Sequence, residues 1–393
     1  MSWVGILLFA AAAVLAVPAL ILLVQVLAAL PSPPPARDSA DARPRVAVLV
    51  PAHDEAAVVE ETLNGISLQL GPGDRVVVVA DNCSDDTAGI AARCGAEVLV
   101  RNDPRLRGKG YALDHGVRAL QADPPEVLVV VDADCQLSPG AIARIATMSR
   151  DTGRPVQALY LMRSPPGSGV GRKLAELAWQ VKNFVRPLGG SRIGMPCQLM
   201  GSGMAFPWAS LGAVRLATGH IAEDVLFGIA LAKAGTPPLF CVDALVESQF
   251  PQSETGVQSQ RKRWVHGNLA LLRAEVPGLL RAGVARRDPR LFAMALDLAV
   301  PPLAMLVMTA GAFVCVTAVA GYAGAGWGGF GLAAGVLAIV VAAVLAAWAR
   351  YGRGIVSGWQ LAFAPVYAVK KVPLYLSFLT RRQTDWVRTR RDS

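Results

Sequence analysis

Charged residues are scarce in this chain. They make up 17% of its 393 residues, while hydrophobic residues make up 53%. The mean hydropathy of +0.42 exceeds what soluble domains usually show. The segment from Trp3 to Leu30 has no charged residue at all, and only Pro18 and Gln25 interrupt its apolar run. This length predicts a membrane span and disfavours a cleaved signal peptide, which carries a basic segment before a shorter apolar stretch.

Cysteine pairs with metal-binding spacing are also lacking. The six cysteines stand at positions 83, 94, 135, 197, 241 and 315, and we interpret them as reduced residues used for packing. The net charge of +9 comes without a basic stripe interleaved with aromatic residues in the centre of the chain, which disfavours a nucleic-acid partner. The basic residues flank the apolar segments instead, where anionic lipid would neutralise them.

Two further apolar stretches, Leu298–Tyr322 and Trp327–Ala349, predict a hairpin of two spans. Arginines at positions 37, 43, 45, 286, 287, 290, 350 and 353 all fall on one side of the three predicted spans. By the positive-inside rule, we expect the middle of the chain and its C-terminus to be cytoplasmic. The spans are then expected to lie in the inner membrane of a cell envelope. The last apolar segment, Trp359–Leu379, contains two prolines and two lysines, so we expect an interfacial or re-entrant helix rather than a full span.

The order of these segments predicts five regions. They are a spanning helix (1–30), a Pro-rich linker (31–44), a cytoplasmic α/β domain with interfacial helices (45–290), a two-helix transmembrane hairpin (291–350), and an interfacial helix with a basic tail (351–393). Two amphipathic segments of the α/β domain, Gly171–Leu188 and Arg263–Arg281, fit either the headgroup layer or an ordinary core-facing role.

Apolar strand patterns alternate with helical patterns in the α/β domain. Strands are expected at 45–50, 75–80, 97–100 and 127–131, and helices at 55–70, 87–94 and 109–122. Strands of continuous Val and Leu separated by helices predict a parallel sheet covered on both faces. Such sheets bind ligands at the carboxyl ends of their strands.

Acidic residues gather at those strand ends. His53 and Glu55 follow the first strand, Asp81 ends the second, and Asp132 and Asp134 follow the fourth. Two carboxylates spaced i, i+2 can share a divalent ion, and hard oxygen ligands suit Mg²⁺ or Mn²⁺. Solvated turns and helix caps are the alternative interpretation of these acids.

Seven motifs then occur in a familiar order: VLVPAHDEAAVVEETL, VVVVADNCSDDTA, RGKGYALDHG, VVVDADC, MGSGMAF, GHIAEDVLFGIAL and QRKRW. In this order they resemble the membrane-bound branch of family 2 glycosyltransferases, which includes exopolysaccharide, cellulose, chitin and hyaluronan synthases. The motifs cover residues 48 to 264. The resemblance implies a Rossmann-like α/β fold of the GT-A type, flanked by transmembrane helices, and an inverting, metal-dependent reaction.

The resemblance also implies roles for single residues. The nucleotide-sugar pocket would be formed by Pro51, His53, Glu55, Asp81, Lys109, Asp132 and Arg263. The metal would be held by Asp132 and Asp134, and Asp224 would be the general base with Glu223 beside it. The acceptor would meet Gly201, Ser202, Gly203, Gln260 and Trp264.

Simple chemistry supports part of this assignment. Inversion needs a base opposite the leaving group, and Asp224 supplies a carboxylate separate from the metal pair. A helix-dipole cap is the alternative for Glu223 and Asp224. Arg263 offers a fixed cation for a diphosphate, or it belongs to a membrane-surface cluster.

The expected function is transfer of a sugar from a nucleotide-sugar, with UDP favoured over GDP, to a lipid-linked or glycan acceptor at the inner membrane face. Exopolysaccharide or cell-envelope glycan synthesis follows from the resemblance, with membrane lipids and polysaccharide-assembly proteins as further partners. Three or four membrane segments favour addition of few sugars over an extruding synthase. The alternatives are a nucleotidyltransferase, disfavoured because PAHDEA lacks a glycine-rich basic loop, and an inactive membrane scaffold.

Overall fold

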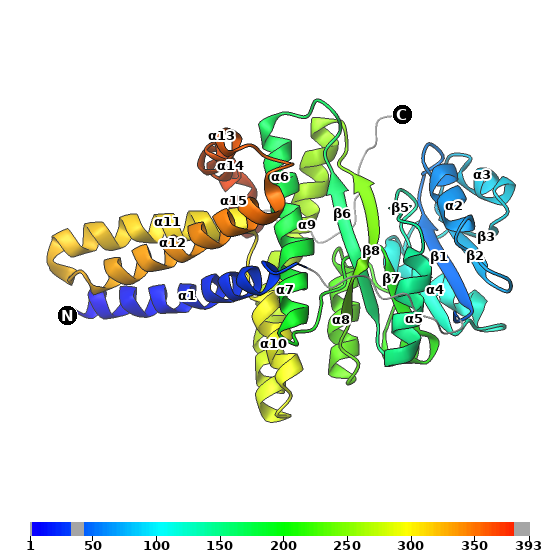
Figure 1. Cartoon of the computed structure of the whole chain (residues 1–393), viewed down its shortest axis with the longest axis horizontal. Coiled ribbons are helices and arrows are strands. Elements are labelled where there is room, and N and C mark those ends of the chain that lie inside the picture. Colours follow the sequence, from blue (N-terminus) through cyan, green and yellow to red (C-terminus); the bar gives the residue numbers. More distant parts are fainter. Residues whose placement is uncertain (1, 33–42, 381–393) are drawn as a thin grey trace. The chain divides into compact units, whose positions relative to one another are not determined.

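The computed structural model describes residues 2–32 and 43–380 (Figure 1). Most of the predicted linker at 31–44 and the basic tail lie outside the described residues. The described chain forms two compact units. The sheet unit comprises its residues from 43 to Pro165 and Pro196–Gly267, and the apolar unit comprises those up to Ser32, Pro166–Met195 and those from Asn268 onward.

The sheet unit is built on eight strands in the order β3-β2-β1-β4-β7-β6-β8-β5. The strand bounds are β1 Val46–Ala52, β2 Arg75–Asp81, β3 Glu97–Arg101, β4 Val127–Val130, β5 Gln136–Leu137, β6 Val156–Arg163, β7 Met204–Pro207 and β8 Leu239–Gln249. The first four strands pair in parallel, as their continuous Val and Leu patterns predict. The expectation of a wholly parallel sheet is wrong, because β7 runs antiparallel to both β4 and β6 and β5 runs antiparallel to β8.

Helices follow the strands of this unit. Their bounds are α2 Val59–Ser67, α3 Thr87–Arg93, α4 Lys109–Leu120, α5 Ala141–Thr152 and α8 Glu223–Lys233. One apolar cluster joins α4 and α8 to the sheet, and it includes Leu49, Leu120, Phe206 and Leu231. Burial of these side chains fixes the N-terminal ends of α4 and α8, where Lys109 and Glu223 begin their helices.

Three helices of the apolar unit are long and apolar enough to cross a membrane, at Trp3–Ala29, Leu303–Ala325 and Gly328–Gly352. They correspond to α1 Trp3–Ala29, α11 Leu303–Ala320 and α12 Gly328–Ala347, the last two each extended by one π-helical turn. Figure 1 shows these three helices side by side. The three predicted spans therefore match helices of the structure.

The remaining helices of the apolar unit are shorter or amphipathic. They are α6 Val170–Gln180, α7 Arg186–Arg192, α10 Pro289–Leu298, α13 Gly358–Leu361, α14 Ala364–Val369 and α15 Val372–Thr380. The long helix α9, Glu254–Ala285, belongs to the sheet unit up to Gly267 and to the apolar unit beyond it. The segment at 359–379 is thus broken into three short helices, and among the described helices it is not one of those long enough to span a membrane.

A buried polar cluster joins α1, α7 and α10. The Arg186 guanidinium donates to Asp297 Oδ1 at 2.7 Å and to Gln25 Oε1 at 2.9 Å, and Gln25 Nε2 donates to the same Asp297 oxygen at 2.6 Å. Gln25 and Arg186 are 1% and 7% exposed, so the three groups satisfy one another in apolar surroundings. We call Gln25, Arg186 and Asp297 the polar clasp.

The C-terminal carbonyls of α1 are capped by side chains from distant parts of the chain. Arg192 donates to Ala28 O at 2.8 Å and to Ala29 O at 3.0 Å. Arg350 donates to Leu30 O at 3.2 Å, and the Tyr351 hydroxyl donates to Ala29 O. Cations at a helix C-terminus are favourable because the last carbonyls have no partner within the helix.

Candidate active site

Asp132 lies just beyond β4, at the carboxyl end of the parallel strands. Its backbone N–H donates to Ser202 Oγ at 3.0 Å. Its carboxylate forms an ion pair with Lys109, the first residue of α4. The Lys109 ammonium also donates to the Gly201 carbonyl at 2.8 Å. The DxD segment, the RGKG motif and the glycine loop therefore meet at one point, as the convergence of motifs at the sheet edge predicts.

Lys109 is held in its charged form. Burial of the side chain lowers its pKa, but the charges of Asp132 and Glu223 outweigh that effect, and the net pKa is raised. The sequence-based expectation placed Lys109 in the nucleotide-sugar pocket, and that role stays a prediction. In the structure its ammonium contacts a carboxylate of the DxD segment.

The DxD carboxylates fit a hard divalent ion. Ligand atoms of Asp132, Asp134 and Cys135 all lie within 4.8 Å of one another. Ser248 donates to Asp134 Oδ2 at 2.7 Å and orients that side chain. Burial and the charge of Asp134 raise the pKa of the Cys135 thiol well above its usual value, and sulfur is a soft donor that Mg²⁺ and Mn²⁺ do not favour. Two carboxylates then remain as donors, the set that Mg²⁺ or Mn²⁺ prefers.

The loop before β7 needs its glycines. Gly201 has φ +98°, and a Cβ built there would lie 3.5 Å from Asp224 Oδ2, 3.7 Å from Lys109 Nζ and 3.9 Å from Asp132 Oδ2. The backbone of Gly201 is therefore surrounded by the three charged side chains that the sequence singled out. A side chain here would enter the space that they share.

The acidic pair that opens α8 divides into two environments. Glu223 is buried, and desolvation together with the charge of Asp224 raises its pKa to about 7. Asp224 accepts a hydrogen bond from the Val225 N–H at 2.9 Å, and its other oxygen faces Gly201. Both carboxylates therefore belong to the charged surroundings of Lys109, and Asp224 is the one whose oxygen lies beside Gly201.

The predicted nucleotide side of the site lies at the tips of β1 and β2. His53 Nδ1 is 2.6 Å from the Asp81 carbonyl oxygen. Glu55 donates its N–H to Thr87 Oγ1 at 2.8 Å, which ties the loop after β1 to α3. Pro51 lies within β1 and pairs with Val79 of β2. These residues are gathered, and their nucleotide contacts stay predictions.

Arg101 is a residue that sequence reasoning missed. It donates to Asp81 Oδ1 at 2.6 Å, and its guanidinium lies 5.6 Å from the centre of the Tyr111 ring. The register between β2 and β3 would have indicated it, because Arg101 ends β3 directly opposite Asp81 at the end of β2. Ser202 and Ser248, which hold the two metal-site aspartates, show the same limit: only the folded sheet brings them together.

Comparison with known proteins fixes the family. A profile of the family described as "Glycosyltransferase like family 2" matches residues 44–267, more than half of the 393-residue chain. This chain belongs to glycosyltransferase family 2. The enzyme class that the motifs predict, a glycosyltransferase, is thereby confirmed.

Relatives of this glycosyltransferase share only part of their length with it. A protein of Mycobacterium bovis, described as an uncharacterized glycosyltransferase, is 34% identical over 122 residues, 29% of this chain and 51% of the relative. A probable glycosyltransferase of Bacillus subtilis, YdaM, is 33% identical over 106 residues, 25% of this chain and 24% of the relative. This chain thus spans about half or less of these relatives.

Among solved structures, a mannosyltransferase of Pyrobaculum calidifontis, in complex with GDP-Man and Mn²⁺, aligns with a TM-score of 0.57 and 19% identity. The alignment covers 96% of this glycosyltransferase and 99% of that chain. Similarity at this identity shows the fold, and it confirms the expected GT-A type.

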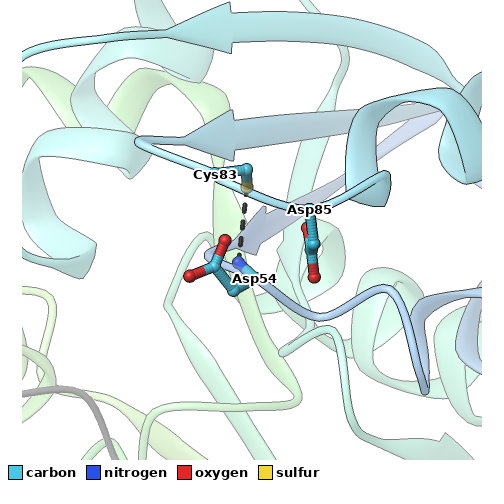
Figure 2. A group of neighbouring side chains, drawn as sticks. All are labelled: Asp54, Cys83 and Asp85. Atoms are coloured by element: carbon cyan, nitrogen blue, oxygen red, sulfur yellow. Dashed lines mark hydrogen bonds between the residues drawn. The ribbon is translucent and has the colours of Figure 1, made fainter.

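A second acidic group of the glycosyltransferase lies between the loops after β1 and β2 (Figure 2). Asp54 accepts hydrogen bonds from the Ser84 N–H at 2.5 Å and from the Ser84 hydroxyl at 3.0 Å, and its own N–H points to Cys83 Sγ at 3.4 Å. Asp85 accepts from the N–H groups of Ala56 and Thr87. Both carboxylates are therefore used to lock the two loops together.

The QRKRW motif lies on α9. Gln260, Arg263 and Trp264 are all half-buried there, and Trp264 packs edge-on against Phe250, with ring centres 6.4 Å apart. Their expected contacts with diphosphate and acceptor stay predictions.

Proposed function

We propose that this glycosyltransferase is an inverting, metal-dependent enzyme that transfers a sugar from a nucleotide-sugar to an acceptor hydroxyl. The observation that carries the proposal is the meeting of Asp132, Lys109 and Asp224 around the Gly201 backbone. A leaving diphosphate needs positive charge, and an attacking hydroxyl needs a base. Lys109 carries positive charge at this point, and Asp224 offers a base.

Asp132 and Asp134 would hold the divalent ion, which supplies Lewis-acid stabilisation to the departing diphosphate. Asp224 would accept the proton of the acceptor hydroxyl while the oxygen of that hydroxyl forms a bond to the anomeric carbon. The bond between that carbon and the phosphate oxygen breaks on the opposite side, which inverts the configuration. The open backbone at Gly201 would let the acceptor approach.

The donor is proposed to be a nucleoside diphosphate sugar, with UDP-sugars favoured by the family resemblance. The mannosyltransferase neighbour holds GDP-Man, so GDP-sugars belong in the same test. Pro51, His53, Glu55 and Asp81 are proposed to bind the nucleoside, with Arg263 near the phosphates. Gln260 and Trp264 are proposed to face the acceptor, while the predicted acceptor residues Ser202 and Gly203 are buried and support the loop that carries Gly201.

The acceptor is proposed to be lipid-linked or a glycan at the cytoplasmic face of the inner membrane, within cell-envelope or exopolysaccharide synthesis. Three features of the apolar unit support a membrane setting. Three helices are apolar enough to span it. Cations stack on aromatic rings in the pairs Lys182–Trp179, Arg353–Trp348 and Lys371–Tyr367. Trp359 is 76% exposed on α13. Aromatic and basic residues of this kind are typical of a headgroup layer.

The test is release of nucleoside diphosphate by the detergent-purified chain, supplied with Mn²⁺ or Mg²⁺, a panel of UDP- and GDP-sugars, and membrane lipid extract. One donor should give metal-dependent release that rises with the lipid extract. Asp224→Asn should lower turnover by about 10²-fold or more and leave donor affinity unchanged, because it removes the proton acceptor alone. Undiminished turnover in Asp224→Asn would remove this residue from the base role.

A further inference from the structure

Lys109 forms an ion pair with Asp132, one of the two proposed metal ligands. Its ammonium pairs with Asp132 Oδ1 and has the Gly201 carbonyl, 2.8 Å away, as a second partner. The Lys109 side chain is only 16% exposed, and the Asp132 side chain is 28% exposed. One of the proposed metal ligands is therefore already neutralised by a cation of the protein itself.

An ammonium and a divalent ion on one carboxylate repel each other even when each takes a different oxygen, because both are positive and water screens them poorly at a partly buried site. Binding of the ion would thus weaken the ion pair of Lys109 with Asp132 and favour its displacement. The displaced ammonium would keep the Gly201 carbonyl and the charges of Glu223 and Asp224 in its surroundings, but it would lose its ion pair with Asp132. Loss of that ion pair by a buried ammonium is costly, so a free ion should bind weakly.

A diphosphate removes this cost, because its oxygens offer the ammonium a new anionic partner and offer the ion further hard ligands. We propose that Lys109 keeps the DxD site closed to a free divalent ion and admits the ion only together with a nucleoside diphosphate. The ammonium then passes from Asp132 to the diphosphate. Lys109 is in this sense a positioning residue, and the inference rests on the metal site of the proposed function.

The proposal makes ion and diphosphate binding reciprocal. Each should raise the affinity for the other by the same factor, and couplings between ligands are typically about 5–150-fold. Removal of the ammonium should weaken that coupling in a particular way. The neutral variant should bind the free ion more tightly than the wild-type chain, although it has lost a contact. A permanent structural clamp on Asp132 would give the opposite result, since loss of the clamp would loosen the ligand.

The experiment is a Mn²⁺ titration of the detergent-purified full chain, followed by the electron paramagnetic resonance signal of free Mn²⁺. It is run without nucleotide and with UDP or GDP, and the complex of Mn²⁺ with each nucleotide in buffer is titrated separately. Lys109→Met and Lys109→Gln are the neutral variants, and Lys109→Arg retains the charge. Lys233→Met is the matched control, because it removes one positive charge at the far end of α8, in an exposed position.

Wild-type chain should bind Mn²⁺ at least about tenfold more tightly with the diphosphate than without it. Lys109→Met and Lys109→Gln should bind Mn²⁺ alone several-fold more tightly than wild type, with a smaller gain when UDP or GDP is added. Lys109→Arg and Lys233→Met should behave like wild type. Thermal unfolding of each variant shows that it is folded.

Mn²⁺ binding by both neutral variants that equals or falls below the wild-type value without nucleotide would overturn the proposal. Asp132→Asn separates this failure from failure of the metal site. If Asp132→Asn abolishes Mn²⁺ binding while the neutral variants bind it no better than wild type, the site stands and the role of Lys109 is wrong. If Asp132→Asn binds Mn²⁺ as wild type does, the metal site itself is wrong, and this inference with it.

Discussion

Two adjacent acids at the start of α8 differ because successive helical residues point about 100° apart. Glu223 is 9% exposed, while an oxygen of Asp224 lies beside Gly201. Burial and the neighbouring charge raise the pKa of Glu223 from 4.5 to about 7. A carboxyl group with a raised pKa binds its proton more tightly in the folded than in the unfolded chain. It therefore stabilises the fold at low pH, and this stabilisation is lost as the pH rises through about 7.

Glu223→Gln should accordingly change the pH dependence of stability. Glutamine has the shape of glutamate but no ionisable carboxyl group. The free energy of unfolding of the variant, relative to wild type, should therefore increase by on the order of 2 kcal/mol between pH 5 and pH 8. The midpoint of thermal unfolding at the two pH values measures the difference. Glu97→Gln is the control, because pairing with Arg75 lowers the pKa of Glu97 below 4.5. Its difference from wild type should be equal at pH 5 and pH 8, and an equal difference for Glu223→Gln would contradict the burial argument.

Single residues were predictable where a motif carried them. The sequence placed Asp132 and Asp134 at the edge of a sheet and separated Asp224 from them, but it could not show which partner each carboxylate has. Lys109 was expected in the nucleotide-sugar pocket, and only the folded chain shows its ion pair with Asp132. Arg101 and Ser248 come from other strands, so local spacing gave no sign of them, and Ser202 was named for the acceptor rather than as the partner of Asp132.

At the scale of elements, the short strand β7 fixes the geometry of the site. It lies between β4 and β6, antiparallel to both, and the glycine loop leads into it. Gly203 has φ +68°, and a Cβ there would lie 2.7 Å from Val246 Cγ2 and 2.8 Å from Ala158 Cβ. A side chain at this position would push β7 away from β6 and β8 and shift Gly201 with it.

Gly203→Ala should therefore destabilise the chain by about 2–4 kcal/mol, from strain at positive φ together with overpacking. Gly153→Ala is the matched control, since Gly153 has φ +62° and open space around its Cβ position. The control measures backbone strain alone and should cost about 1 kcal/mol. Chemical or thermal unfolding compares the two variants, and equal losses would contradict the packing role.

The elements themselves divide into those a local pattern predicts and those it does not. Strands β1, β2 and β4 are runs rich in buried Val and Leu, β3 is a partly exposed run of Val and Leu, and helices join the four, so their parallel order follows from the sequence. The helix expected from Glu55 begins only at Val59, because the Glu55 carbonyl accepts from Val58 and Val59 in a turn. Strands β5 and β7 have two and four residues, which is too short for a clear sequence pattern. Antiparallel strands also need no crossover helix between them, so no helical pattern in the sequence indicates their pairing.

At the scale of the molecule, the apolar unit is held by more than apolar contact. Helices that face lipid gain little from the hydrophobic effect against one another, so close packing and hydrogen bonds matter more. The polar clasp supplies such bonds between α1, α7 and α10. A Cβ at Gly189 of α7 would lie 1.7 Å from the Gln25 carbonyl oxygen, so α7 and α1 touch through their backbones.

Asp297→Ala should destabilise the apolar unit by about 3–5 kcal/mol, because it leaves the buried Arg186 guanidinium without its carboxylate. Asp288→Ala, in the same helix, removes only the N-cap that accepts from Arg290 and Leu291 and should cost about 1 kcal/mol. Thermal unfolding in one detergent, with the yield of folded chain after extraction, ranks the two variants. A loss for Asp297→Ala no larger than that for Asp288→Ala would show that the clasp contributes little.

The capped end of α1 bears on how the chain is made. The first helix leaves the ribosome early, yet Arg350, which donates to its last carbonyls, is translated 320 residues after Leu30. Arg192 arrives midway and closes part of that end. The contacts of Arg350 and Tyr351 with the end of α1 can therefore form only late in synthesis. A chain truncated before residue 350 would lack the contacts of Arg350 and Tyr351 with Leu30 and Ala29, and the end of α1 would keep only those of Arg192.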